Sequence, residues 1–267
     1  MPERSRPWLT AVASLALVWA TAGCALLKEE PATTSWPAGP GLSWQWQLSG
    51  TLDPEAEARV FVLDPFTNPA EDTRRLAARD RRLICYVEVG TYLPARPDAA
   101  RFPVGALGTA ADTSGSRWLD IRQWSVLEPI VADRFRLCRG KGFHAVMPAG
   151  MDGYANSTGF PLTFDDQLVF NRRVASLARS LGLSPGLTND LDQVVALAPE
   201  FDFAVNEECF QRGECARLLP FIQAGKAVFH VEYDQPTSVF CTTAIGYGFA
   251  SIRKNRSLDA WREPCPE

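Results

Sequence analysis

The feature that most constrains the fold is a regular alternation of short apolar runs with segments of helical pattern. The runs have the length of buried strands, and helix-start signals such as Asn68-Pro69 lie between them. Eight runs are apolar through their bodies: 44–48, 60–64, 83–90, 143–147, 184–190, 203–208, 227–233 and 249–254. Such runs are typical of parallel strands covered by helices, and eight of them predict an α/β fold, a single (β/α)8 barrel of the TIM type.

The alternative architecture is an open, doubly wound sheet. Sheets of that kind that bind nucleotides have a glycine-rich phosphate loop after the first strand, and none follows the first run here. Two helix starts can be placed from the sequence. Ser125-Val-Leu-Glu128 has the spacing of a capping box and predicts a helix that ends near Gly140, and Thr163-Phe-Asp-Asp166 predicts another that ends at about Leu181.

The first residues have the pattern of an export signal. Arg4 and Arg6 precede an apolar run, 8–20, that is too short to span a bilayer, and Thr21-Ala-Gly-Cys24 closes it. A cysteine directly after Ala-Gly resembles the lipobox of bacterial lipoproteins, in which the thiol is lipidated. We expect residues 1–23 to be a signal peptide with lipid on Cys24, residues 24–40 a flexible tether and residues 41–267 the barrel; an ordinary secretory signal is the alternative.

Export to an oxidising compartment allows the other cysteines to pair, although spacing alone leaves their connectivity open. Cys209 and Cys215 are close enough for a local bridge, and Cys241 can hold the end of the chain through Cys265. Cys85, in a strand-like run, is interpreted as a buried thiol. The two histidines, His144 and His230, lie far apart without a cysteine or carboxylate motif, so neither zinc nor another cofactor is expected.

The charge balance bears on partners. A formal net charge of −4 and an isoelectric point near 5.4 give no electrostatic reason to expect nucleic acid. No apolar stretch beyond the signal segment is long enough for a transmembrane helix. We therefore expect a monomeric, exported α/β domain whose contact with a membrane is limited to the lipid on Cys24.

Polar residues end seven of the eight predicted strands. In a barrel these carboxyl ends converge on one mouth, where active sites lie. Loops that follow strands are solvent-exposed and polar in most proteins, which explains part of the pattern. It does not explain the bias towards acids and amides, which can bind the hydroxyl and ammonium groups of an amino sugar. The residues are Gln47, Asp64, Glu88, Asn189 with Asp190, Glu207 with Glu208, Glu232 with Tyr233, and Arg253 with Lys254. The remaining strand ends in Met147-Pro-Ala-Gly150, which is chemically inert.

Several blocks, in order, resemble glycoside hydrolase family 114, the endo-α-1,4-polygalactosaminidase-like barrels. They include LICYVEVGTY, RPDAARFP, GFHAV, MDGYANSTGFPLT, FAVNEECF and PFIQAGKAVFHVEYDQ, and they extend from about Trp44 to Cys265. The resemblance implies a TIM-like barrel that hydrolyses polymers containing α-1,4-linked galactosamine. It also implies that Glu207, in Asn206-Glu-Glu-Cys209, is one of the two catalytic carboxylates. The implied substrate-binding residues are Gln47, Asp64, Tyr86, Arg96, Asp98, Asp152, Tyr154, Asn189, Asp190, Glu232 and Tyr233.

The chain departs from the family pattern at the inert strand end. Where the family has glutamate-proline-aspartate-asparagine, this chain has Met147-Pro-Ala149-Gly150, so the second catalytic carboxylate is replaced by Ala149. His144 and Leu93 also stand where the family has acids. Because glycoside hydrolysis generally needs two carboxyl groups, the resemblance implies an edited active site. Rebuilding it with Ala149→Asp, Met147→Glu and Gly150→Asn is expected to restore hydrolysis.

Three functional interpretations follow. In the first, the chain is an active hydrolase in which Glu88 or Asp152 has replaced the missing acid. In the second, it is a non-catalytic lipoprotein that binds polysaccharide in the barrel mouth. In the third, the barrel is only a scaffold for an envelope protein. Hydrolysis of a galactosamine polymer by the purified protein separates the first interpretation from the second.

Overall fold

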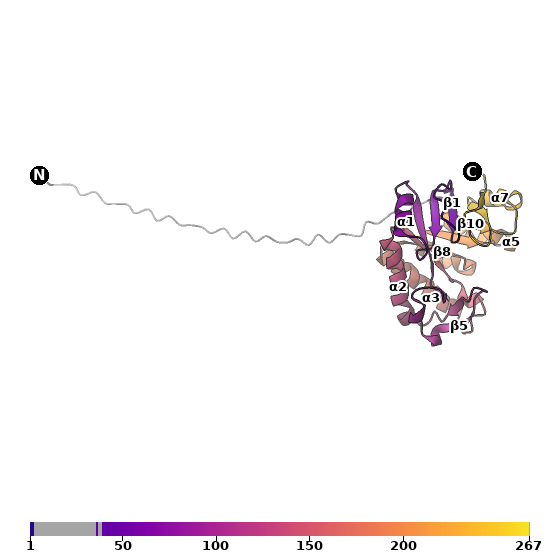
Figure 1. Ribbon diagram of the computed structural model, residues 1–267, viewed down its shortest axis with the longest axis horizontal. Coiled ribbons are helices and arrows are strands. Elements are labelled where there is room, and N and C mark those ends of the chain that lie inside the picture. The colour runs from indigo at the N-terminus through magenta and orange to yellow at the C-terminus, as the bar shows by residue number, and fades with distance from the viewer. Residues whose placement is uncertain (3–35, 37–38, 267) are drawn as a thin grey trace. The chain divides into compact units, whose positions relative to one another are not determined.

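The strands of the barrel follow one another in chain order. In the computed structural model, which describes residues 1–2, 36 and 39–266, eight parallel strands form one sheet (Figure 1). They are β1 (Trp44–Gln47), β2 (Val60–Leu63), β3 (Arg82–Glu88), β7 (Ala145–Ala149), β8 (Ser184–Thr188), β9 (Phe203–Glu207), β10 (Ala227–Glu232) and β11 (Ala250–Lys254). Each overlaps one of the eight predicted runs, although β3 begins one residue earlier and β7 ends two residues later, and the TIM-like barrel is confirmed. The predicted signal peptide, Cys24 and most of the tether lie outside the described residues.

Helices connect successive strands and cover the outside of the sheet. They are α1 (Ala70–Ala77), α2 (Trp124–Gly140), α3 (Phe164–Ser180), α4 (Val194–Leu197), α5 (Cys209–Arg212), α6 (Leu219–Gln223) and α7 (Thr237–Gly246). Short 3-10 turns lie at η1 (Ala99–Arg101), η2 (Val104–Ala106), η3 (Gly153–Ala155), η4 (Leu191–Gln193), η5 (Ala198–Glu200) and η6 (Cys215–Leu218). No helix in the described part of the chain is long and apolar enough to cross a membrane.

The two predicted helix caps have different outcomes. Thr163 and Asp166 form a capping box at the start of α3, as predicted. The box predicted at Ser125 is wrong: α2 begins at Trp124, with Gln123 as the N-cap and no side-chain cap. Ser125 therefore lies inside the first turn, where its side chain cannot act as an N-cap.

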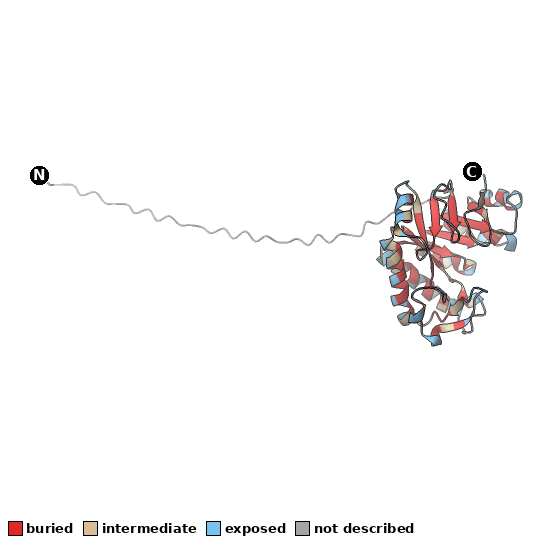
Figure 2. Cartoon of the chain, in the orientation of Figure 1, coloured by how far each residue is buried: buried red, intermediate tan, exposed pale blue. Residues whose placement is uncertain are grey.

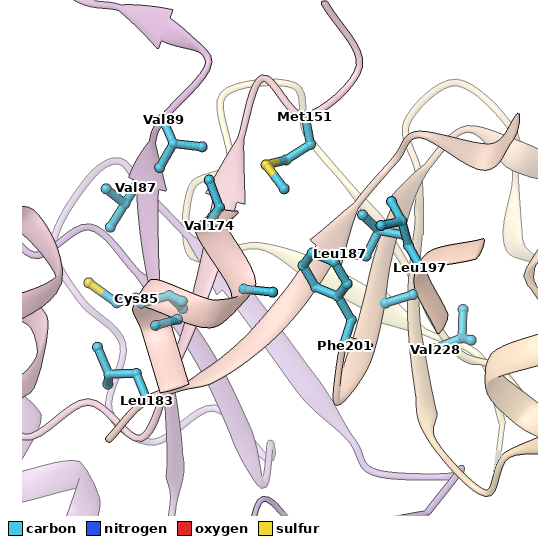
Figure 3. Close-up of a cluster of buried hydrophobic side chains, with 14 of the residues drawn as sticks. Cys85, Val87, Val89, Met151, Val174, Leu183, Leu187, Leu197, Phe201 and Val228 are labelled. Carbon is cyan, nitrogen blue, oxygen red and sulfur yellow. The ribbon is translucent and has the colours of Figure 1, made fainter. Parts of the chain in front are cut away.

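The strands separate two apolar cores. Inside the barrel, alternate residues of every parallel strand except β8 pack in one cluster, for example Phe203 and Val205 of β9 or Ala145 and Met147 of β7. The intervening residues pack outwards against the helices, and Figure 3 shows part of this outer cluster around Leu187. Figure 2 shows that burial is concentrated in the strands. This alternation decides which residues at the strand ends face the mouth.

The barrel is completed by the C-terminal segment. β1 and β11 share no backbone ladder among the described strands; instead β12 (Arg262–Pro264) runs antiparallel on the outer edge of β11. The Trp44 indole donates to the Ala250 carbonyl at 3.0 Å. The ammonium of Lys254 donates to Gln45 Oε1 at 3.0 Å and to the carbonyls of Asp259 and Trp261. These contacts join the first strand to the last.

A second, three-stranded sheet follows β3. Its strands, β4 (Thr91–Tyr92), β6 (Arg117–Leu119) and β5 (Leu107–Ala110), are antiparallel and pair in that order. The sheet belongs to the long connection between β3 and α2, at the carboxyl end of β3 (Figure 1). The connection therefore supplies one wall of the barrel mouth.

Three disulfides connect the described cysteines. Cys241 is bonded to Cys265, with a Cα–Cα distance of 5.4 Å, and Cys209 to Cys215, with a distance of 4.7 Å. The interpretation of Cys85 as a free thiol is wrong, since it is bonded to Cys138 of α2. Cys85 points outwards from β3, and a disulfide to the covering helix replaces the apolar contact expected there.

Candidate active site

A cavity of about 460 Å³ lies at the carboxyl end of the barrel strands. The inward-facing ends of the strands line its floor, and the connection between β3 and α2 forms its wall. The predicted residues that line it are Asp64, Tyr86, Glu88, Leu93, Arg96, Ala149, Gly150, Asp152, Asn189 and Glu207. A second cavity of about 360 Å³ adjoins it and shares Trp118, Asp152, Asn189 and Glu207 with the first. Together the two cavities form a groove across the mouth.

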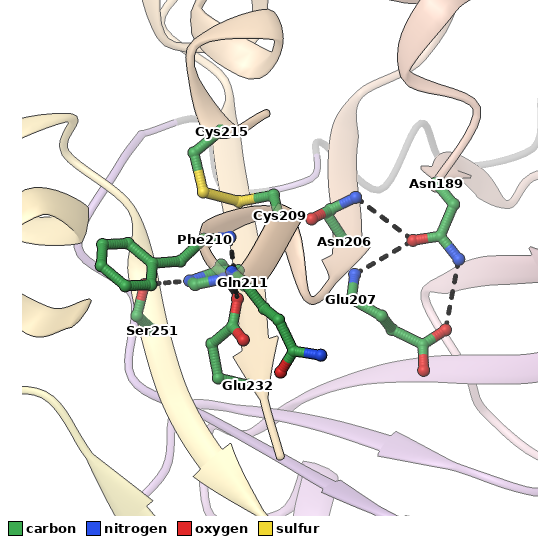
Figure 4. The surroundings of a disulfide bond; sticks show 10 residues. Asn189, Asn206, Glu207, Cys209, Phe210, Gln211, Cys215, Glu232 and Ser251 are labelled. Atoms are coloured by element: carbon green, nitrogen blue, oxygen red, sulfur yellow. Dashed lines mark hydrogen bonds and ion pairs between the residues drawn. A yellow bond between two sulfur atoms is a disulfide. The ribbon is translucent and has the colours of Figure 1, made fainter. Parts of the chain in front are cut away.

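Glu207 is held in a fixed orientation at the centre of this groove. It follows Phe203 and Val205 on the inner face of β9, so its side chain points into the mouth. The Tyr233 hydroxyl donates to Glu207 Oε2 at 2.6 Å. Asn189 Nδ2 donates to Glu207 Oε1 at 3.2 Å (Figure 4). Burial and the nearby Glu207 carboxylate raise the pKa of Tyr233, so the hydroxyl stays protonated as a donor.

Asp152 is an acid with a raised pKa that lines the groove beside Glu207. It follows β7 and lines both cavities. Burial raises the pKa of its carboxyl group, and the charge of Glu207 raises it further. Two carboxyl groups, one oriented by hydrogen bonds and one with a raised pKa, are the components that acid–base chemistry on a glycosidic bond requires.

Glu88 also faces the mouth, but a cation neutralises it. Ile84 and Tyr86 of β3 belong to the inner cluster, which places Glu88 on the same face. Arg96 binds both of its oxygens, at 3.0 and 2.6 Å, and donates to Asp64 Oδ2 at 2.7 Å. All three side chains are buried. Because Arg96 occupies both carboxylate oxygens, neither is free to contact a glycosidic bond, so Glu88 is a poor replacement for a catalytic acid.

The second cavity is rich in acids. Asn189 and Asp190 both have a left-handed backbone, with φ of 54° and 50°, which turns the chain sharply after β8. Asn171 of α3 donates to Asp190 Oδ2 at 2.7 Å, and the Tyr154 hydroxyl lies 3.4 Å from Asp192 Oδ2. The acids of this cavity are Asp152, Asp190, Asp192, Glu207, Glu208 and Glu214, against the bases Arg212 and Arg217.

The comparison with known proteins decides the family. The profile of the glycoside-hydrolase family GH114 matches residues 27–267. The chain belongs to glycoside hydrolase family GH114. It is similar to Aspergillus fumigatus Ega3, whose crystal structure is a complex with galactosamine: the TM-score is 0.82 at 32% identity, over 86% of this chain and 98% of that one.

Another similar structure is the glycoside hydrolase domain of PelA from Pseudomonas aeruginosa. The TM-score is 0.66 at 13% identity, over 84% of this chain and 98% of that one, which is a likeness of fold. A comparison with curated proteins found no match.

The positions expected to differ from the GH114 pattern do not all lie in the site. Leu93, Ala149 and Gly150 line the larger cavity. Met147 is fully buried among apolar side chains inside the barrel. His144 lies at the opposite, amino end of β7, where Nδ1 accepts a hydrogen bond from the Leu83 amide at 3.1 Å. Burial lowers the pKa of His144. His144 therefore lies away from the mouth.

Two of the three substitutions expected to restore hydrolysis would strain this barrel. A glutamate at 147 would place a carboxylate in the apolar interior of the barrel. Gly150 has φ of +77°, and a Cβ there would lie 2.9 Å from the carbonyl carbon of Gly90. Asparagine at 150 would therefore clash with the backbone of the neighbouring strand end. Ala149, by contrast, lines the larger cavity, so Ala149→Asp is the substitution of the three that we retain.

Four predicted substrate-binding residues do not line either cavity: Tyr233, which binds Glu207, and three that lie away from the mouth. Gln47 points outwards from β1, and its amide bonds the 49–53 loop. Glu232 points outwards from β10 and accepts hydrogen bonds from the Phe210 amide at 2.8 Å and from His230 (Figure 4). Asp98 forms a bidentate ion pair with Arg134. The placement of these three in the mouth is wrong, because two of them lie on the outer face of a strand and the third is held by α2.

Other residues of the groove were missed. Trp118 lines both cavities, and Trp46, Thr188, Asp112, Ser114 and Ser116 line the larger one. Thr188 is on the inner face of β8, so counting every second residue along the strand would have found it. Trp118 and the 112–116 segment belong to the small sheet, for which the sequence carries no comparable signal.

Proposed function

We propose that this chain binds a polysaccharide containing α-1,4-linked galactosamine along the groove. Its membership of GH114 and its similarity to Ega3, which was crystallised with galactosamine, support this substrate class. The excess of carboxylates over arginines along the groove supports it independently, because ammonium groups of an amino sugar need anionic partners.

We further propose that hydrolysis by the natural sequence is slow or absent. The observation that carries this proposal is Ala149, whose methyl group lines the same cavity as Glu207. A methyl group can neither protonate a leaving oxygen nor attack an anomeric carbon. Loss of a catalytic carboxylate typically raises the barrier by about 5 kcal/mol or more.

A second candidate is hydrolysis through Glu207 and Asp152. The raised pKa of Asp152 and its position in both cavities favour it. In this mechanism one carboxyl group protonates the glycosidic oxygen while the other activates water or attacks the sugar.

One pair of measurements tests both candidates. Calorimetry with an α-1,4-galactosamine oligomer measures binding, and release of reducing ends measures hydrolysis. Binding with little or no release supports the first proposal. Release that disappears in both Glu207→Gln and Asp152→Asn supports the second. Absence of binding overturns both.

We propose that the protein is exported and anchored by lipid on Cys24, with the barrel as a monomer. The basic start, the short apolar run and Thr21-Ala-Gly-Cys24 support this location. Cell fractionation tests it: the natural protein is expected in the membrane fraction and Cys24→Ala is not. Equal distribution of the two would contradict lipidation.

A further inference from the structure

Asp190 has an incomplete set of hydrogen-bond partners. Its side chain is only 4% exposed, and Oδ2 accepts a hydrogen bond from Asn171 at 2.7 Å. Oδ1 is buried and has no partner among the described residues. A buried carboxylate oxygen without a partner costs stability and is uncommon unless a ligand or ion completes it.

The support behind Asp190 is rigid. Gln167 of α3 donates to Asn171 Oδ1 at 2.8 Å, and Asn171 also donates to the Met151 carbonyl at 2.9 Å. Gln167 Oε1 accepts from the Tyr154 amide at 3.3 Å. This chain of hydrogen bonds fixes Asp190 against α3 and the loop after β7, at the edge of the second cavity.

We propose that Asp190 forms a subsite that binds an ammonium group of the substrate in the second cavity. The ammonium group would supply the hydrogen-bond partner that Oδ1 lacks. The inference rests on the proposed polysaccharide ligand and assigns one residue that distinguishes a free amine from an N-acetylated one. An acetamide carries no charge and cannot form this ion pair. Tyr154 lines the same cavity.

The surroundings of Asp190 favour a cation. The ionisable groups that face it are Asp152, after β7, Tyr154, in η3, and Asp192, in η4. Asp192 is paired with Arg217, which leaves Asp152 and Asp190 as neighbouring acids. Burial and the charge of Asp152 raise the pKa of Asp190 to about 8. An arriving ammonium group would stabilise the ionised form, so binding should release a proton below that pH.

Calorimetry on the full chain tests the subsite with two probes, an α-1,4-galactosamine oligomer and the same oligomer fully N-acetylated. Asp190→Asn keeps the acceptor for Asn171 but removes the charge. We expect it to bind the galactosamine oligomer at least roughly ten-fold more weakly than the natural protein, as for loss of one charge-assisted hydrogen bond. Its binding of the acetylated oligomer should stay the same.

The pH dependence gives a readout that a merely structural role would not change. Ionisation of Asp190 should make the natural protein bind the galactosamine oligomer more tightly as the pH rises from about 5.5 to about 7, and Asp190→Asn should lose that rise. The matched control is Asp202→Asn, the same change at the amino end of the barrel, where Asp202 pairs with Arg179.

The outcomes are distinct. Equal binding of the galactosamine oligomer by the natural protein and Asp190→Asn overturns the subsite and leaves the proposed function standing. Equal weakening towards both oligomers also overturns it, because the residue would then act on the fold. If the natural protein binds neither oligomer, the proposed function fails, and the subsite with it.

Discussion

Glu88 and Glu207 are two glutamates at the inner ends of barrel strands, and their neighbours give them different chemistry. Glu207 is oriented by the neutral donors Asn189 and Tyr233, which leave its negative charge available to a substrate. Glu88 is neutralised by a bidentate arginine that also binds Asp64. Residue type and strand position are the same, so the difference comes from long-range partners.

The Arg96 cluster gives a prediction about stability. Arg96→Met removes the cation from between two buried carboxylates and leaves both without a counter-ion. We expect the free energy of unfolding to fall by about 3 to 5 kcal/mol, measured by urea denaturation. Arg75→Met is the control, because its ion pair with Glu71 is solvent-exposed and should matter little. Equal effects of the two changes would contradict a clamping role for Arg96.

At this scale the sequence predicted which residue types gather at the mouth, but not which way each one points. Asp64, Glu88 and Glu207 are on the inner face, whereas Gln47 and Glu232 are one residue out of phase and face outwards. Counting every second residue from the apolar residues of each strand would have distinguished the inward-facing residues from the outward-facing ones. The ion pair between Asp98 and Arg134 could not be predicted from strand alternation, because the two residues lie 36 positions apart in the sequence.

Among the elements, the ends of β3 and β7 are in unusually close contact. The amides of Val89 and Gly90 both donate to the Ala149 carbonyl, at 3.1 and 3.0 Å. A Cβ at Gly90 would lie 1.7 Å from the Gly150 oxygen. Glycine at both positions therefore brings Ala149 and the start of the small sheet together at the cavity.

Gly90→Ala should push these strand ends apart. We expect it to lower the free energy of unfolding by about 3 kcal/mol, near the upper end for an overpacked site, and to weaken binding of the galactosamine oligomer. Gly140→Ala, at the end of α2, has open space around its Cβ and should be tolerated. Thermal unfolding of the two variants compares them, and unchanged stability of Gly90→Ala would show that the contact is not tight in solution.

The barrel strands could be predicted from the sequence, and the strands of the small sheet could not. Each of the eight barrel strands has an apolar body that is visible as a run. The strands of the small sheet have only two to four residues and mixed burial, so no periodicity can develop. Its contribution to the groove, Trp118 included, depends on contacts with the rest of the barrel and becomes visible only in three dimensions.

At the scale of the whole molecule, the barrel depends on its C-terminal segment. Lys254 joins β11 to β1, and burial lowers its pKa to about 8. The Cys241–Cys265 disulfide holds the segment that carries β12. The same segment brings Arg256 to Glu208 at 2.6 Å and Leu258 into the larger cavity. Closure of the barrel and completion of the groove are therefore coupled.

Removing this disulfide tests the coupling. The bond closes a loop with a sequence separation of 24, so Cys241→Ser with Cys265→Ser should lower the free energy of unfolding by about 3 kcal/mol. We also expect weaker oligomer binding, because Arg256 and Leu258 lose their anchor. Removal of Cys209–Cys215, with a separation of 6, should cost less stability. The reverse order of the two losses would contradict this role of the C-terminal segment.

The central claim is that a GH114 barrel retains its groove but lacks one carboxylate, at position 149. The most direct measurement is the rate of reducing-end release from an α-1,4-galactosamine oligomer by the natural protein, Ala149→Asp and the neutral control Ala149→Asn. We predict that Ala149→Asp alone gains hydrolysis, by roughly three orders of magnitude, and that Glu207→Gln abolishes the gain. The claim would be contradicted if the natural protein, Ala149→Asp, Ala149→Asn and the double variant with Glu207→Gln all bind the oligomer and Ala149→Asp is no more active than Ala149→Asn.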